Sequence, residues 1–152
     1  MKCKIYGLGV LKQYKYVVIL SEYKGKILLS RHRDRNTWET QGGHIEKGET
    51  PMEAAKRELF EESGAIVFQL EPLFDYWAGE EGSATLNNGM VFGAIIEELG
   101  SLPNSEMAET KQFDQLPENL TYPEITPNLF DYKRELQLSP KEQITIESME
   151  TD

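Results

Sequence analysis

Six glutamates occur in one stretch, residues 43–65, which reads GHIEKGETPMEAAKRELFEESGA, although the chain already carries a formal net charge of -10. Three of them, Glu58, Glu61 and Glu62, lie directly after Arg57. Carboxylate oxygens with no cysteine or histidine among them are typical ligands of hard cations such as Mg²⁺ or Mn²⁺. The stretch therefore suggests either a site for a divalent cation or an ordinary acidic helix face in contact with water.

Local signals place these glutamates on a helix. Thr50 suits the N-cap, Pro51 suits the first helical position, and Glu53 completes a capping box. Gly64 stands where a left-handed residue commonly ends a helix. We therefore predict a helix from Pro51 to Ser63.

The position of the carboxylates on this helix favours the cation site. On a helical wheel, Glu58, Glu61 and Glu62 form one stripe that adjoins the apolar stripe instead of opposing it. Glu58 and Glu62 are four residues apart, a like-charge pair that destabilises an isolated helix. Ala54 and Ile66, at the next positions of this spacing, carry no positive charge. A bound cation would neutralise carboxylates left uncompensated at the edge of a core.

The elements that must position this helix are readable from hydrophobic patterning. We predict four strands from β-branched and aliphatic runs, the first two forming a hairpin: Tyr16–Leu20, Lys26–Ser30, Ile66–Trp77 and Met90–Glu98. Helical spacing returns over Pro123–Leu138. The order of strands, helix, strands and helix predicts an α/β (α+β) fold in which helices sandwich a mixed sheet.

The bulk composition sets the class of protein. A chain of 152 residues with 39% hydrophobic and 28% charged residues fits one globular domain, which we assign to residues 1–138, followed by a polar and poorly ordered tail, 139–152. Cys3 is the single cysteine, which excludes an internal disulfide and a cysteine-based zinc site. No apolar run approaches the roughly 20 residues needed to span a membrane, and no secretory signal is evident, so we expect a cytoplasmic protein.

Charge also restricts the partners. A sequence pI near 4.8 argues against broad binding of nucleic acids or membranes, because such binding needs basic surfaces. Arg31, His32, Arg33 and Arg35 nevertheless form a basic strip just before the acidic stretch. The strip is either a solvated loop or a binding site for an anion.

The acidic stretch resembles a Nudix box, G-x5-E-x7-R-E-U-x-E-E-x-G-U, where U is a bulky aliphatic residue. Eight fixed positions match: Gly43, Glu49, Arg57, Glu58, Leu59, Glu61, Glu62 and Gly64. Ala65 replaces the final aliphatic residue, a departure that affects packing and not chemistry. The order of elements from Tyr16 to Leu138 is also similar to that of MutT-type Nudix hydrolases, which implies an α/β/α sandwich.

The resemblance implies roles for individual residues. Glu58, Glu61 and Glu62 would be metal ligands, together with the backbone carbonyl of Gly42. Glu58 would also deprotonate the attacking water, so that Glu58, Glu61 and Arg57 form the catalytic set. Arg57 would orient a carboxylate through its planar fork.

Other residues would act around this centre. Glu49 and Gly43 would form its outer shell, with Glu49 bracing Arg57. One further acidic ligand would come from the loop before the last helix, where Glu109 and Glu106 are the candidates. Substrate contacts would come from the residues that flank the box: Arg31 to phosphate, His32 nearby, and Glu124 to the base.

The implied activity is Mg²⁺-dependent hydrolysis of a nucleoside diphosphate linked to another group, with Mn²⁺ as the alternative ion. A nucleoside triphosphate cleaved to monophosphate and pyrophosphate is the preferred reaction, and the protein would be a monomer or a homodimer. MutT-type sequences often read E-F-P-G-G where this chain reads ETQGG, which changes the floor of a base site. The aromatic residues considered for stacking a base are Trp38, Phe74, Tyr76 and Trp77.

Two other functions are compatible with the resemblance. Prenyl diphosphate isomerases of this fold typically have a catalytic cysteine, and Cys3 lies far from the box. A non-catalytic module that binds nucleotides or RNA would usually lack some of the box glutamates, whereas this chain has all of them. The residues therefore favour the hydrolase.

Overall fold

The computed structural model describes residues 1–82 and 87–137 of the chain. Within these ranges, eight strands form one mixed sheet. Their bounds are β1 Lys2–Tyr6, β2 Tyr16–Tyr23, β3 Lys26–His32, β4 Trp38–Glu39, β5 Gln41–His44, β6 Ala65–Gly79, β7 Asn88–Leu99 and β8 Met107–Phe113. Helix α1 spans Pro51–Ser63, and residues 126–137 form a second helix.

The sheet divides along one edge of β2. Its main path runs β1-β6-β7-β2-β3-β4, while β5 also pairs with β2 and β8 with β3. The first half of β2 pairs with β5, from Tyr16 opposite His44 to Ile19 opposite Gln41, and only its last residues pair with β3. The β2–β7 pair is parallel, and the other pairs within the sheet are antiparallel. The strands β3 and β5 therefore diverge beside α1.

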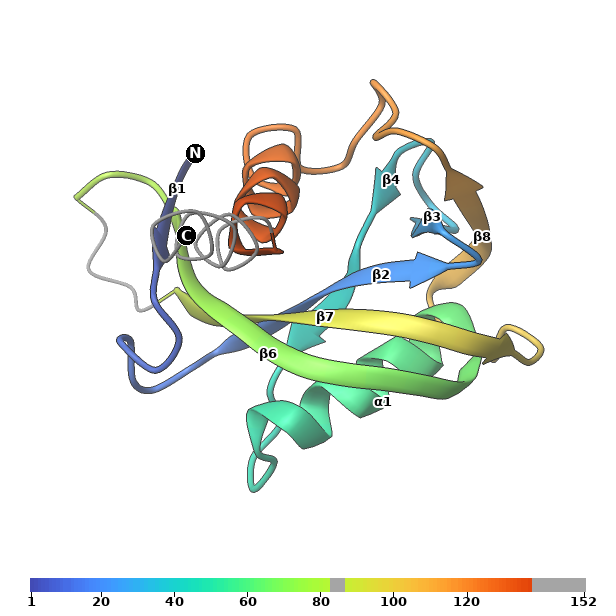
Figure 1. The fold of residues 1–152 in the computed structure, drawn as a ribbon, viewed down its shortest axis with the longest axis horizontal. Coiled ribbons are helices and arrows are strands. Elements are labelled where there is room, and N and C mark those ends of the chain that lie inside the picture. The colour runs from blue at the N-terminus through green and yellow to red at the C-terminus, as the bar shows by residue number, and fades with distance from the viewer. Residues whose placement is uncertain (83–86, 138–152) are drawn as a thin grey trace, which may run out of the picture.

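The two helices cover opposite faces of the sheet (Figure 1). Helix α1 packs Ala55 and Leu59 against Val17 and Ile19 of β2 in one buried cluster. The helix 126–137 packs Leu129 against the other face, in a cluster that includes Phe74. The predicted α/β/α sandwich is confirmed.

The structure confirms the predicted hairpin and the predicted bounds of α1. Thr50 Oγ1 accepts from the Glu53 amide, and Gly64 caps the helix with a φ of 80°. The second helix begins at 126 instead of 123, because residues 123–125 form a turn in which Ile125 N donates to Tyr122 O. The placement of Glu109 in a loop is wrong, because Glu109 lies within β8. The tail 139–152 lies outside the described residues.

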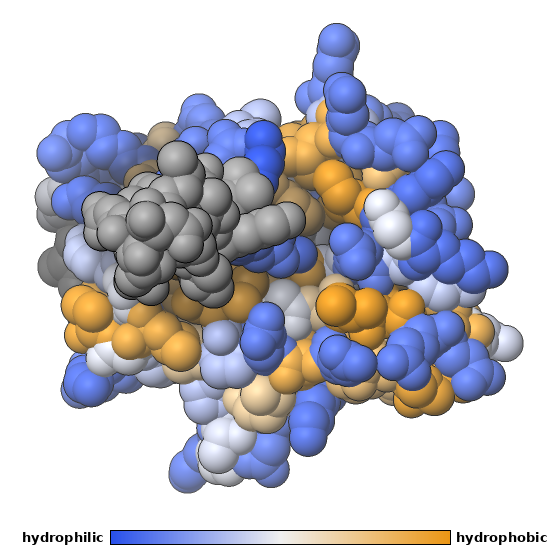
Figure 2. All heavy atoms as spheres, in the orientation of Figure 1, coloured by the Kyte–Doolittle hydropathy of each residue, from blue (hydrophilic) through white to orange (hydrophobic). Residues whose placement is uncertain are grey.

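No helix among the described residues is long and apolar enough to cross a membrane. Hydrophilic side chains cover most of the face shown in Figure 2, with smaller hydrophobic areas between them. Ile66, Val67 and Ile95 are among the apolar side chains left exposed.

A buried polar side chain joins the strands where the sheet divides. Gln41 of β5 is fully buried, and its Oε1 accepts from Ser21 Oγ of β2 at 2.6 Å. Its Nε2 donates to Ser30 Oγ at 2.9 Å and to Leu28 O at 3.2 Å, both on β3. Ser30 Oγ in turn donates to Glu62 O at 2.7 Å. The amide thus bridges two diverging strands and fixes the end of α1.

We expect Gln41→Leu to lower the free energy of unfolding by roughly 2–3 kcal/mol, because it leaves buried polar groups of β2 and β3 without partners. Urea denaturation followed by circular dichroism measures this change. Gln69→Leu, at an exposed position of β6, is the matched control and should change stability by less than about 0.5 kcal/mol. Equal effects of the two substitutions would contradict the bridging role of Gln41.

Candidate functional site

Arg57 of α1 lies at the centre of a cluster of glutamates. Its Nε and Nη2 donate to the two carboxylate oxygens of Glu49 at 2.7 and 2.9 Å, a bidentate pair. Its Nη1 donates to Glu58 Oε1 at 2.7 Å and, more weakly, to Glu61 Oε2 at 3.4 Å. The bonds from Arg57 lower the pKa of the Glu49 carboxyl to about 2. The structure thus brings together four of the predicted site residues.

The expectation that no basic group relieves the Glu58–Glu62 pair is wrong for Glu58. Neighbouring residues on a helix point in different directions, so the spacing did not predict a contact between Arg57 and Glu58. The arginine side chain is long enough to reach that carboxylate, at 2.7 Å. Burial still raises the pKa of Glu58 above its ordinary value, against the opposing effect of Arg57.

Glu62 differs from Glu58 because no cation compensates it. Only 8% of the residue is exposed, and its Oε1 accepts from the backbone N–H of Gly42 at 2.7 Å. Burial, followed by the negative charges of Glu58, Glu39 and Glu106, raises its pKa to about 8. Within the described part of the chain, Glu62 forms no ion pair with lysine or arginine. An oxygen-rich, negatively charged and partly dry donor set of this kind fits a divalent cation.

Two glycines allow this arrangement. A Cβ atom at Gly42 would lie 2.3 Å from Val17 O, and one at Gly43 would lie 2.9 Å from Glu58 Cδ. Strand β5 therefore passes between β2 and α1 at a separation that a larger residue would not permit. This close approach places the Gly42 backbone against Glu62.

The carboxylates do not converge on one point in this structure. Across residues 1–82 and 87–137, no three Asp, Glu, His or Cys side chains are grouped closely enough to hold a metal ion. Arg57 holds Glu58 and Glu61, while Gly42 holds one oxygen of Glu62. Binding of a cation would therefore require Glu58, Glu61 and Glu62 to change their present hydrogen bonds and turn toward one point.

Four further predicted residues lie in two pairs, Arg31 with Glu109 and His32 with Glu106. Arg31 of β3 donates from Nε to Glu109 Oε1 of β8 at 2.8 Å, so the proposed phosphate contact and the proposed metal ligand bind each other. Glu106 lies 3.7 Å from His32 Nε2, and its charge raises the pKa of Glu58 and of Glu62. Of the two loop candidates, Glu106 is therefore the one whose charge acts on the cluster.

Glu124, the residue predicted to contact a base, lies outside the cavity that could hold one. Its carboxylate lies 2.9 Å from the amino group of Met1 and is 61% exposed. It does not line the cavity described below, although Tyr122 and Thr126 on either side of it do.

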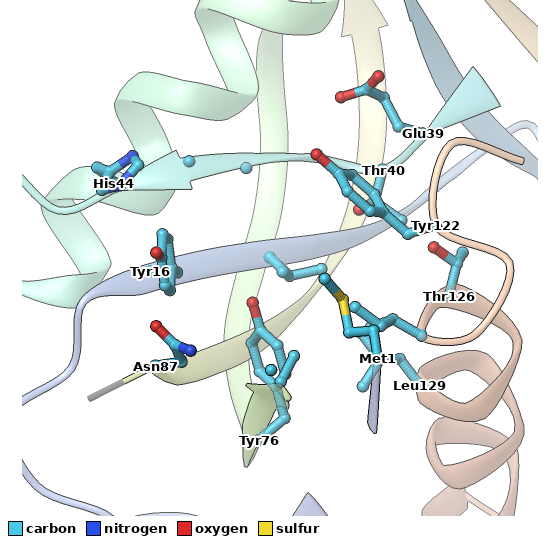
Figure 3. Close-up of a pocket in the computed structure, with 16 residues that line it drawn as sticks. Met1, Tyr16, Glu39, Thr40, His44, Tyr76, Asn87, Tyr122, Thr126 and Leu129 are labelled. Carbon is cyan, nitrogen blue, oxygen red and sulfur yellow. The ribbon is translucent and has the colours of Figure 1, made fainter. Parts of the chain in front are cut away.

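A cavity of about 430 Å³ opens beside the two glycines (Figure 3). Three tyrosines line it, Tyr16 of β2, Tyr76 of β6 and Tyr122, together with Glu39 of β4. His44 lies against Tyr16, with ring centroids 4.7 Å apart. Such a volume and such aromatic walls suit a flat ring with a few polar groups.

Only one of the four predicted stacking residues lines this cavity, namely Tyr76. Phe74 and Trp38 are buried in the core, and Trp77 lies beneath Lys4, whose Nζ is 5.6 Å from the centre of its ring. Sequence reasoning missed Tyr16, Tyr122 and Glu39.

Comparison with known proteins agrees with the box and its setting. The model of the NUDIX domain matches residues 12–136 of the chain, which is most of its length. The chain belongs to the NUDIX family. Members of this family typically use a divalent metal, which is the kind of ion that the donor set around Glu62 fits.

Several NUDIX relatives cover different shares of the chain. YtkD of Bacillus subtilis (strain 168), a candidate 8-oxo-dGTP diphosphatase, is 37% identical over 110 residues, which are 70% of this chain and 66% of YtkD. An RNA pyrophosphohydrolase of Psychrobacter cryohalolentis is 43% identical over 47 residues, 31% of this chain and 27% of that protein. The chain thus spans less than two thirds of each of these relatives.

Among solved structures, a mutant of the pyrophosphohydrolase BsRppH of Bacillus subtilis matches with a TM-score of 0.69 and 28% identity. The match covers 93% of this chain and 90% of BsRppH. The fold and the order of its elements are therefore shared along nearly the whole of both chains.

The buried state of Glu62 predicts a pH dependence of stability in metal-free buffer. Its folded pKa of about 8 lies above the ordinary value of 4.5, so ionisation costs more in the folded state. The resulting loss of stability is absent below pH 4.5 and develops as the pH rises to about 8. Glu62→Gln should remove this loss and should exceed the wild type in stability at about pH 8.

Urea denaturation in the presence of a chelator, at about pH 5 and about pH 8, tests this expectation. Glu98→Gln, at an exposed position of β7, provides the control and should follow the wild-type dependence on pH. A Glu62→Gln protein whose stability falls between the two pH values as steeply as that of the wild type would contradict the assignment.

Proposed function

We propose that this protein hydrolyses a pyrophosphate bond of a nucleotide with the help of Mg²⁺, for which Mn²⁺ is a substitute. The preferred reaction converts a nucleoside triphosphate to the monophosphate and pyrophosphate. The observation that carries the proposal is that the buried, uncompensated carboxylate of Glu62 is bound by Gly42, which lines a cavity large enough for a nucleoside. Family membership supports a phosphoanhydride as the bond that is cleaved.

The proposed ligands of the cation are Glu58, Glu61 and Glu62 with the carbonyl of Gly42. We propose Glu106 as the further acidic ligand instead of Glu109, because its charge already acts on Glu58 and Glu62. When bound, a divalent cation neutralises charge on the phosphate oxygens and makes water easier to deprotonate.

In this mechanism Glu58 takes a proton from the attacking water while the water oxygen forms its bond to phosphorus and the anhydride P–O bond breaks. Burial raises the pKa of the Glu58 carboxyl, which favours its acceptance of a proton. Arg57 holds the Glu58 carboxylate in one orientation, and Glu49 holds Arg57 from the other side. The leaving group carries away the electron pair of the broken bond.

The nucleoside would occupy the cavity lined by the three tyrosines, with its phosphates directed past Gly43 toward Glu58. Arg31 is bound to Glu109 in this structure and would contact phosphate only after leaving that partner. His32 Nε2 lies 3.7 Å from Glu106 Oε2. Both residues stay predicted substrate contacts, and the chemistry proposed at the anhydride is assigned to other side chains.

A second candidate substrate is the 5′-triphosphate end of an RNA. Relatives that are RNA pyrophosphohydrolases match part of the chain, and the bond to be cleaved is chemically the same. The net charge of -10 supports the smaller substrate, because an RNA chain would bring many phosphates that need basic contacts.

We expect Glu58→Gln to lower kcat by about 10²- to 10⁴-fold, the range of general acid–base catalysis. Purified protein would be incubated with Mg²⁺ and with deoxynucleoside triphosphates, 8-oxo-dGTP, ADP-ribose, dinucleoside polyphosphates or triphosphorylated RNA, and released phosphate and pyrophosphate would be measured. Glu98→Gln is the matched control and should retain wild-type turnover.

A chelator should abolish turnover, and added Mg²⁺ should restore it. If the wild type cleaves none of these compounds with either metal, the proposed hydrolysis is wrong. Tight nucleotide binding without turnover would then favour the non-catalytic module.

A further inference from the structure

A second cavity lies between the C-terminal half of the helix 126–137, the turn that joins β2 to β3, and the segment 114–116 that follows β8. Its volume is about 620 Å³. The residues that line it are all different from those around the cavity of the three tyrosines. The helix 126–137 covers the sheet face opposite α1 (Figure 1), so this second cavity is separate from the glutamate cluster.

Lys133 of this helix is half-buried and lines the second cavity. It also lines a smaller cavity of about 310 Å³ on the side of β6 and β7. Across residues 1–82 and 87–137, the Lys133 ammonium forms neither an ion pair nor a hydrogen bond. Burial lowers the pKa of Lys133, and the charges of Glu22 and Glu71 oppose this effect only in part. An anion beside Lys133 would stabilise its charged form.

The charges around the second cavity favour an anion. Three cationic and two acidic side chains line it, namely Lys26, Lys133, Arg134, Glu22 and Asp114. Lys26 lies 3.6 Å from Asp114, and Arg134 donates to Asp131 at 2.8 Å. Lys133 is therefore the cation of this set that no described carboxylate pairs with. The excess of positive charge here contrasts with the net charge of -10 of the whole chain.

The other groups around the second cavity favour a phosphate over a carboxylate. Lysine binds phosphate as a point charge, and Gln115 and Gln137 add amide donors from two segments. Donors that approach from several directions suit a tetrahedral phosphate group, whereas a carboxylate is planar. Leu116 and Phe130 form an apolar part of the wall, which lowers the local dielectric constant and strengthens an ionic contact.

We propose that the second cavity is a binding site for a small phosphate compound, whose phosphate group contacts Lys133. The volume is sufficient for inorganic pyrophosphate or for a small organic phosphate. The site is independent of the proposed hydrolysis, because it lies outside the glutamate cluster and needs no divalent cation. Inorganic and organic phosphates share the recognised group, and separate titrations distinguish them.

Isothermal titration calorimetry on the full chain, freed of metal ions by a chelating resin and held in phosphate-free buffer, measures this binding. Pyrophosphate, glycerol 3-phosphate and the dicarboxylate malonate are titrated separately. Without a cation, the glutamate cluster repels these anions, so the binding measured is that of the second cavity. Pyrophosphate or glycerol 3-phosphate should bind, and malonate should bind more weakly than either.

Substitutions of opposite effect test the role of Lys133. Lys133→Met keeps most of the side-chain length without the charge and should weaken phosphate binding by about 10-fold or more, the effect of a hydrogen bond to a charged group. Glu22→Gln removes a negative charge at the same cavity and should raise the affinity by about two- to fivefold. Lys56→Met, at an exposed position of α1, is the matched control and should retain the wild-type affinity.

Four results would each overturn the proposal: no binding of either phosphate compound, binding of malonate as tight as theirs, an unchanged affinity in Lys133→Met, or an equal loss in Lys56→Met. Circular dichroism of each variant verifies that it is folded. An increase in affinity in Glu22→Gln is a change that damage to the fold would not produce, and a decrease there would contradict the site. Because no turnover is measured, these results stand apart from the success or failure of the proposed hydrolysis.

Discussion

The hydrogen bond from the Gly42 amide to the Glu62 carboxylate is the contact on which the arrangement of the site depends. It requires β5 to run against α1 on one side and β2 on the other, and Gly42 permits this because a Cβ atom there would lie 2.3 Å from Val17 O. Because β5 occupies this position, β3 must diverge from β2, and the buried Gln41 amide replaces the strand pairing lost there. The same divergence leaves the cavity on one side of the glycines and the glutamates on the other.

Charge is distributed unevenly across this site. Arg57 contacts Glu49, Glu58 and Glu61 and offsets part of their negative charge. Glu62 remains buried among further negative charges and is compensated only by a backbone N–H. Such a group lowers stability, so its presence fits a requirement of function. A cation supplied with the substrate would restore the balance.

Sequence reasoning succeeded where the controlling interactions are local. The helix Pro51–Ser63 was predictable because Thr50, Glu53 and Gly64 determine its ends within a few residues of each cap. It failed for β1, β4, β5 and β8: β4 and β5 span only two and four residues, and β1 and β8 pair with strands far away along the chain. The Arg31–Glu109 pair follows from the register of β3 with β8, and the Glu39–Thr121 bond joins residues 82 positions apart. Neither contact can be predicted from the spacing of residues in the sequence, because each joins segments that are distant along the chain.

The fate of the basic strip explains how an acidic protein could accept an anionic substrate. Sequence alone made Arg31, Arg33 and Arg35 candidates for binding phosphate. In the structure each guanidinium already has an internal acceptor: Arg31 has Glu109, Arg33 has the Ser105 carbonyl, and Arg35 has Glu39. Arg31 and Arg35 are therefore paired with carboxylates of β8 and β4, whereas the Ser105 carbonyl positions Arg33 without neutralising its charge. Cations held by the glutamates of α1 would supply further positive charge for the proposed pyrophosphate substrate.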